Sequence, residues 1–238
     1  GKRIWAEGVG RLRDIFADVV EQDFVGIDGK VYALPLYLDT LALFYNRDAL
    51  KNASVVYPPA NWTEFQNIVP RLRALNPQRQ IVKAAAAIGG STKTVETMDD
   101  LLSLLMIQNG ARMTNDDRTK ADFSGPGGEG GFAAFRFYLQ FANAASSYYT
   151  WNESQKEALQ SFAEGKVAMM FQYHRAIPEI TARAPFLDFA VAPMLQVEGN
   201  EVAVNYPEYW GFAVSRQSRS PSWAWDFVFR TTTRPELM

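Results

Sequence analysis

Two kinds of apolar segment alternate along the chain, and this alternation restricts the fold more than any other feature. Short runs rich in aromatic and aliphatic residues are typical of strands, and they cover residues 31–37, 41–45, 81–87, 167–171, 189–192 and 209–214. Between these runs, apolar residues recur every three or four positions, which is typical of amphipathic helices. Strands that alternate with helices predict an α/β protein whose sheets are mostly parallel and covered on both faces.

Several helix boundaries carry local signals. Asn61 can accept a hydrogen bond from the first turn of a helix that begins at Trp62, and Glu64 completes a pair that resembles a capping box. Pro70 lies inside this helical pattern and predicts a kink or a break. The pair Ser220-Pro221 predicts the start of a last helix. Further helices are expected up to about Phe24, from Met98 to Gly110, from Phe132 to Ala142 and from Ala158 to Gly165.

Composition excludes several classes of function. With 238 residues, of which 47% are hydrophobic, the chain can bury the core of one large domain or of two lobes. Its net charge of -2 argues against a nucleic-acid partner. Without cysteine there are no disulfides, thiol nucleophiles or cysteine-zinc sites, and His174 is the only histidine. We therefore expect no metal, no cofactor and no catalytic residues.

Four segments, taken in order, carry a family resemblance. Residues 28–50 contain a Gly-Lys turn, a strand with a proline and then Tyr-Asn-Arg-Asp. The other segments are residues 58–65 (PPANWTEF), 162–170 (FAEGKVAMM) and 210–214 (WGFAV). Their order and spacing resemble bacterial extracellular solute-binding protein family 1, the maltose-binding-protein-like binding components of sugar ABC transporters. The resemblance covers most of the chain but starts partway into the family pattern, so we expect an internal portion of a longer protein.

The resemblance implies a two-lobed fold of the periplasmic-binding-protein type II, in the α/β class. The N-terminal part of the first lobe and the C-terminal end are expected to be missing. Residues 1–38 and 195–238 would form lobe 1, and residues 39–194 would form lobe 2. The hinge crossings would lie near residues 37–42 and 192–195, and hinge closure would hold the ligand.

The function that the resemblance implies is capture of a mono- or oligosaccharide in the cleft between the lobes, followed by delivery to the permease of an ABC transporter. The protein would be a monomer, periplasmic or extracellular, with a lipid anchor left open, and would not be an enzyme. Two alternatives remain: a two-lobed carbohydrate-active enzyme with Asp39 and Glu208 as its acid and base, or a ligand-sensing domain without transport.

Carboxylates and aromatic residues supply most of the ligand-binding residues implied by the resemblance. Asp39 and Glu208 would accept hydrogen bonds from sugar hydroxyls, and Met98 and Asp99 would begin a helix that contacts the ligand. Aromatic rings stack on the apolar faces of sugar rings, and the candidates are Tyr37, Tyr173, Tyr209 and Trp210. Other interpretations are open, because Asp39 and Asp99 also suit helix termini and the aromatic residues also suit a core.

The chain departs from the family at one point of the expected site. After residues 165–169 the family commonly has a glycine followed by a tryptophan that stacks on sugar, whereas this chain reads FQYHR from Phe171 to Arg175. The identity of the ligand is therefore left open. Tyr173 can still stack, and the possible hydrogen-bond donors are Gln172, His174 and Arg175. Three aromatic residues on helix stripes are expected in the core instead, namely Phe132, Phe135 and Phe162.

Overall fold

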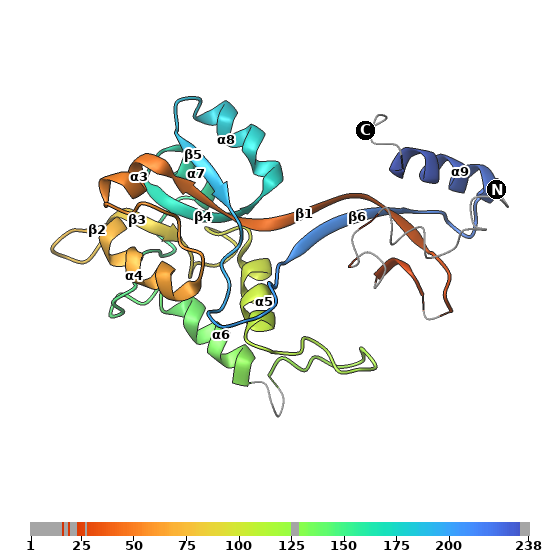
Figure 1. Ribbon diagram of the computed structural model, residues 1–238, viewed down its shortest axis with the longest axis horizontal. Coiled ribbons are helices and arrows are strands. Elements are labelled where there is room, and N and C mark those ends of the chain that lie inside the picture. Colours follow the sequence, from red (N-terminus) through yellow and green to blue (C-terminus); the bar gives the residue numbers. More distant parts are fainter. Residues whose placement is uncertain (1–15, 17–18, 20–22, 27, 125–128, 234–238) are drawn as a thin grey trace. The chain divides into compact units, whose positions relative to one another are not determined.

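The computed structural model describes residues 16, 19, 23–26, 28–124 and 129–233 (Figure 1). The chain divides into two compact units, which are Gly1–Asp39 with Pro207–Met238 (unit 1) and Thr40–Tyr206 (unit 2). The helix expected before Phe24 lies largely outside the described residues. The elements are β1 Ala33–Asn46, α3 Arg47–Asn52, α4 Trp62–Leu72, β2 Ala74–Leu75, β3 Ile81–Ala87, α5 Met98–Gln108, α6 Glu129–Leu139, α7 Ala158–Ala163, β4 Val167–Tyr173, η1 His174–Ala176, α8 Ile177–Arg183, β5 Phe189–Ala192, β6 Pro207–Ala213 and α9 Pro221–Thr232.

The sheet of unit 2 is mixed, so the expectation of mostly parallel strands is wrong. Its order is β2-β3-β4-β1-β5. β3 and β4 are parallel, whereas β1 is antiparallel to both β4 and β5, and β2 is antiparallel to β3. A parallel pair requires a long crossover connection, and the helices α5, α6 and α7 provide one between β3 and β4. β1 precedes that crossover and runs in the opposite direction between its neighbours.

One strand replaces the two that the sequence predicts around residue 40. β1 is extended over all 14 residues from Ala33 to Asn46. Residues 41–45 of β1 pair with β4, and β6 also pairs with β1. Close to this pairing, a Cβ atom added to Gly211 of β6 would lie 3.0 Å from the carbonyl oxygen of Leu34. Because pairing supports the strand along its length, the polar residues Asp39 and Thr40 do not end it.

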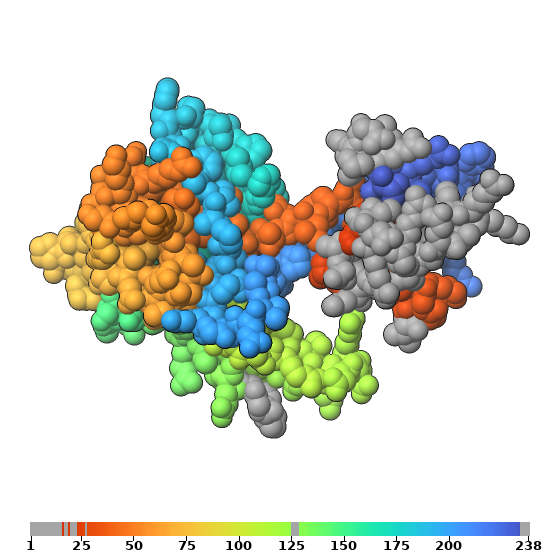
Figure 2. All heavy atoms as spheres, in the orientation of Figure 1, coloured from red at the N-terminus to blue at the C-terminus, as the bar shows by residue number. Residues whose placement is uncertain are grey.

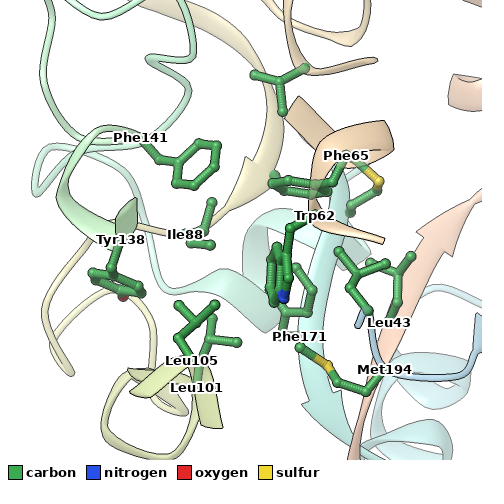
Figure 3. Packing of buried hydrophobic residues seen from close by; sticks show 14 of the residues in the cluster. Leu43, Trp62, Phe65, Ile88, Leu101, Leu105, Tyr138, Phe141, Phe171 and Met194 are labelled. Atoms are coloured by element: carbon green, nitrogen blue, oxygen red, sulfur yellow. The ribbon is translucent and has the colours of Figure 1, made fainter. Parts of the chain in front are cut away.

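Helices cover both faces of the sheet of unit 2. Leu41 and Leu43 of β1 belong to one buried cluster, which also contains residues of α4, α5 and α6. Phe44 points to the other face and packs with residues of α7 and α8. This alternation is the period of two that a strand imposes on its side chains. Figure 3 shows the first cluster, in which the ring of Trp62 lies beside those of Phe65 and Phe171, with centroids 5.6 and 5.4 Å apart.

α4 begins with the predicted cap, and the break that was one of the two outcomes predicted at Pro70 is absent. Asn61 caps the helix by accepting a hydrogen bond from the amide of Glu64 at 2.8 Å, and the Glu64 carboxylate accepts from the amide of Ala60 at 2.8 Å. Pro70 does not break the helix, which continues to Leu72. Proline removes one hydrogen bond from a helix, and here only two helical residues follow it.

α6 buries a different stripe from the expected one. Its buried residues are Gly131, Ala134 and Tyr138. Phe132 and Phe135 are 56% and 43% exposed, so their assignment to the core is wrong, whereas Phe162 of α7 is fully buried as expected. Gly131 explains the difference, because a Cβ atom there would lie 2.1 Å from the carbonyl oxygen of Phe123. The close approach of these two segments needs the glycine on the inner side of α6.

Residues 195–206 belong to unit 2 by their contacts, although the sequence analysis grouped them with the C-terminal segment. The Gln108 amide donates to the carbonyl oxygens of Leu195 at 2.8 Å and of Val204 at 3.1 Å. The amide of Trp62 donates to the carbonyl oxygen of Gln196 at 3.1 Å. These bonds to α4 and α5 hold the segment until Tyr206. Across the residues that the structure covers, none of the helices has the length and apolar character needed to cross a membrane.

Candidate functional site

The carboxyl ends of β3 and β4 meet at one edge of the sheet of unit 2, because these two strands are parallel. From β3 the chain enters a loop, residues 88–97, that leads to α5, and from β4 it enters η1. Ligands of open α/β sheets bind outside the carboxyl ends of the strands. The topology therefore brings six predicted site residues to this edge: Met98, Asp99, Gln172, Tyr173, His174 and Arg175.

Asp100 lies at the centre of a polar cluster at this edge. The Tyr173 hydroxyl donates to the Asp100 carboxylate at 2.8 Å. Tyr206 lies near the same carboxylate, whose negative charge acts on its hydroxyl. Burial raises the pKa of the Tyr173 hydroxyl, and the hydrogen bond to Asp100 raises it further. Burial likewise raises the pKa of Tyr206, and the charge of Asp100 raises it further, so both phenols stay protonated.

Sequence reasoning missed Asp100 and named its neighbour Asp99. An acidic pair in the first turn of a helix is a general signal of the helix dipole, and it does not say which member faces a site. Successive helical residues point about 100° apart, so one of the two carboxylates can reach Tyr173 while the other points elsewhere. Only the position of α5 against β4 decides this.

Tyr173 is 1% exposed and belongs to a buried cluster, so its ring packs inside unit 2. The guanidinium carbon of Arg175 lies 4.6 Å from the centre of this ring, which is the range of a cation–π contact. Arg175 and His174 are both exposed, in η1. At the carboxyl end of β4, the ring of Tyr173 is therefore buried, whereas the polar side chains of His174 and Arg175 are exposed.

Gln172 is 2% exposed, and both the oxygen and the nitrogen of its side-chain amide form hydrogen bonds within the protein. Its oxygen accepts from the amide of Tyr173 at 2.8 Å, and its nitrogen donates to the carboxylate of Glu96. Glu96, a residue that sequence reasoning missed, is exposed. Gln172 thus positions Glu96 at the edge of the sheet, and its predicted contact with ligand stays a prediction.

The loop of residues 88–97 is held by three other segments. Glu153 accepts from the amide of Ser91 at 2.6 Å and from its hydroxyl at 3.0 Å. The hydrogen bond from the Ser91 backbone is the main reason why the pKa of Glu153 is lowered. Tyr138 donates to the carbonyl oxygen of Gly90 at 2.6 Å, and Thr97 donates to that of Phe171 at 2.8 Å. A loop held in this way preorganises the start of α5, and with it Asp99 and Asp100.

Met98 and Asp99 lie next to each other but in different surroundings. Met98 is half-buried and packs against both hydrophobic clusters of unit 2. Asp99 is exposed and lines a cavity of about 470 Å³ with residues of α5, α6 and the segment after α5. That segment, yellow-green in Figure 2, extends from the helices of unit 2 and contains a bridge between Thr114 and Ala121. Apart from Asp99, the residues of the cavity are Leu102, Ser103, Met106, Met113, Phe123, Ser124, Gly131, Phe132 and Phe135.

The remaining predicted residues lie in unit 1 on two paired strands. Tyr37 and Asp39 are on β1, and Glu208, Tyr209 and Trp210 are on β6. Tyr37 is 40% exposed and Trp210 is 63% exposed, so neither ring is a core residue of the described unit. Asp39 and Glu208 are half-buried.

Tyr209 makes contacts within unit 1 through its ring and its hydroxyl. The ring meets Phe24 edge to face, with centroids 5.6 Å apart, and the hydroxyl donates to Asp23. In a strand, alternate side chains point to the same face. Tyr209 therefore lies on one face of β6, and Glu208 and Trp210 lie on the other. Among the residues described, no group of three histidine, aspartate or glutamate side chains could hold a metal ion.

Comparison with known proteins gives a family match over nearly the whole chain. Residues 7–238 match the sequence model of a family described as bacterial extracellular solute-binding protein. A protein of Brucella abortus (strain 2308), provisionally described as a binding protein, is 29% identical over 187 residues, which are 77% of this chain and 43% of that protein. A protein of Brucella suis biovar 1 (strain 1330) with the same kind of description has the same identity and coverage.

Solved structures share the fold at low sequence identity. The sugar-binding protein MalE from Xanthomonas citri has a TM-score of 0.71 at 18% identity, over 95% of this chain and 54% of its own. An ABC transporter solute-binding protein from Thermotoga lettingae, bound with α-D-tagatose, has a TM-score of 0.67 at 21% identity, over 94% of this chain and 55% of its own. UgpB from Mycobacterium tuberculosis, in complex with glycerophosphocholine, has a TM-score of 0.68 at 18% identity, over 94% and 53%. The chain spans about half the length of these proteins and less than half that of its curated relatives.

Proposed function

Because this chain belongs to the bacterial extracellular solute-binding protein family, we propose that it binds a saccharide and delivers it to the permease of an ABC transporter. The family and the structural neighbours are binding proteins rather than enzymes. The observation that supports a saccharide is the polar cluster around Asp100 at the carboxyl edge of β3 and β4.

The chemistry of this cluster suits a hydroxylated ligand. Sugar hydroxyls donate hydrogen bonds, and charge-assisted acceptors such as carboxylates form the strong ones. A carboxylate has about four acceptor positions, so Asp100 can accept from the Tyr173 hydroxyl and still accept from a ligand. The exposed ring of Trp210 in unit 1 suits the apolar face of a sugar.

The proposed mechanism is closure of two lobes around the saccharide. The lobes would follow the two compact units, residues 1–39 with 207–238 and residues 40–206, instead of the division expected at residue 195. The first crossing would lie near residues 37–42. A ligand that contacts both lobes shifts the population toward the closed form, because it binds that form more tightly. The closed form would be the one that the permease recognises. The protein would act as a monomer outside the cytoplasm, in the periplasm or at the cell surface.

Asp100→Asn is expected to weaken sugar binding about fivefold, which corresponds to about 1 kcal/mol. The substitution keeps the shape and an acceptor for the Tyr173 hydroxyl, but it replaces charge-assisted hydrogen bonds to the ligand by neutral ones. A thermal-shift screen over mono- and oligosaccharides identifies a ligand, and isothermal titration calorimetry then gives the dissociation constants of wild type and variant.

Asp188→Asn is the matched control for this substitution. Asp188 pairs with Arg47 at 3.1 Å next to the start of β5, at the opposite edge of the sheet from Tyr173. Its substitution should leave the dissociation constant unchanged. Equal affinities of wild type and Asp100→Asn would show that the cluster does not contact the sugar, and failure of every saccharide in the screen would contradict the proposed ligand class.

Trp210→Ala should weaken binding by about 1–3 kcal/mol, the burial value of a large side chain, and leave the fold intact. The ring is 63% exposed, so its removal takes little packing from unit 1. Isothermal titration calorimetry measures the affinity of the variant for the sugar, and circular dichroism shows whether the variant is folded. Unfolding of the variant with unchanged affinity in its folded fraction would make Trp210 a structural residue and move the stacking role to Tyr37 or Tyr173.

A further inference from the structure

We propose that the site selects its solute by charge: the solute carries no net negative charge, and an amine-bearing saccharide binds at least as tightly as its neutral parent. This inference rests on the proposed function, because it names the class of saccharide that the same site accepts. It follows from the signs of the side chains at the edge of unit 2 and from the way in which the hydrogen-bond donors there are used.

Carboxylates outnumber cations at the carboxyl edge of β3 and β4. Glu96, Asp99 and Asp100 lie in the loop after β3 and in the first turn of α5, whereas Arg175 is the guanidinium in η1. Lys93, in the same loop, lies near Glu153, whose pKa its charge helps to lower. The charges of Lys93 and Glu153 offset one another, so the net charge at this edge is negative.

The two buried side-chain donors at this edge, those of Gln172 and Tyr173, are directed to protein acceptors. The Tyr173 hydroxyl donates to Asp100, and the side-chain amide of Gln172 donates to Glu96. What the edge offers to a ligand is therefore mainly acceptor oxygen atoms. Hydroxyl and ammonium groups donate to such atoms, whereas a carboxylate or phosphate has no donor and requires one.

Arg175 carries the positive charge of η1 and favours an anion. Its guanidinium carbon lies 4.6 Å from the centre of the Tyr173 ring, and the Tyr173 hydroxyl is itself bonded to Asp100. An anion that reached Arg175 would thus stand close to a carboxylate of the same sign. The candidate acids of unit 1, Asp39 and Glu208, are also negative, so the predicted residues of that unit do not reverse the preference.

One unit charge at about 6 Å, at an effective dielectric constant of about 40, changes a binding constant about tenfold. This is the expected effect for each charge removed near the ligand. Charges further away than the Debye length, about 10 Å at 0.1 M salt, contribute little. The charge effect should therefore be large for Asp100 and small for acids at the other edge of the sheet.

The experiment uses three matched probes for each of glucose, galactose and mannose: the neutral hexose, its 6-amino-6-deoxy derivative and its uronic acid. Each set changes only the group at carbon 6. Calorimetry at 0.02 M and 0.2 M salt gives the ratio of the dissociation constants of the uronic acid and the neutral sugar. For the wild type we expect a ratio of about ten or more, which falls at the higher salt concentration.

Two variants test the cause of this ratio. Asp100→Asn should lower it about tenfold, and Arg175→Gln should raise it by a similar factor. Asp188→Asn is the control, because five residues of β1 separate its edge from that of Tyr173, which corresponds to about 17 Å. The control removes the same charge and should leave the ratio unchanged.

The outcomes separate the two proposals. If hexoses bind and the uronic acid is the tightest of its set, the charge selection is wrong and the saccharide function stands. The charge selection would also be wrong if Asp100→Asn and Asp188→Asn changed the ratio of dissociation constants equally. The effect would then come from the net charge of the protein. If none of the nine probes binds, the proposed function fails for hexoses, and the charge selection fails with it.

Discussion

Trp62→Ala is expected to lower the free energy of unfolding by about 3–5 kcal/mol, the range for removal of a large buried aromatic residue. The Trp62 side chain is 5% exposed, and its ring packs against those of Phe65, Phe137 and Phe171 with centroids 5.4 to 5.6 Å apart. Its indole nitrogen donates to the buried side-chain oxygen of Gln108 at 2.7 Å. The substitution leaves a cavity and also a buried acceptor without its donor.

Urea unfolding followed by far-ultraviolet circular dichroism measures this change without relying on tryptophan fluorescence. Trp223→Ala is the matched control, because the Trp223 side chain in α9 is 78% exposed. An exposed substitution away from special features changes stability by about 0.5 kcal/mol or less. If both tryptophan variants lose the same stability, the cluster around Trp62 does not hold unit 2 together.

Gly131→Ala should destabilise the protein by about 1–2 kcal/mol, although alanine is usually the better helix former by about 1 kcal/mol. In α6 the added Cβ atom would lie 2.1 Å from the carbonyl oxygen of Phe123, and 3.2 Å from its carbonyl carbon. The contact is with backbone atoms, so the segment that contains Phe123 must move away from α6. Overpacking of this kind costs about 1–3 kcal/mol or more.

Ala133→Gly tests the helix propensity of α6 separately. Ala133 is exposed in the same helix, so this variant should lose only about 1 kcal/mol. Both variants are compared with wild type by urea unfolding. A gain of stability in Gly131→Ala would mean that α6 and the Phe123 segment are not in close contact in solution. The exposure of Phe132 and Phe135 would then need another explanation.

The sequence by itself determined the features that depend on neighbouring residues. Asn61 and Glu64 predicted the start of α4, because a helix cap is made within four residues. The strands at 81–87 and 189–192 were predicted to the residue, since short runs of apolar residues define them. Gly110 follows α5 with a φ of 78°, as expected of a glycine that ends a helix. The order of four such segments was also enough to indicate the family.

Contacts between segments that lie far apart in the sequence decided the rest. The direction of β1 depends on pairing with β4 and β5, which come more than 120 residues later. The inward face of α6 depends on Phe123, and the choice between Asp99 and Asp100 depends on how α5 packs beside Tyr173. Periodicity describes one element at a time and cannot say which neighbour that element meets. The tertiary structure therefore decided which carboxylate bonds to Tyr173, because only packing brings the first turn of α5 to the end of β4.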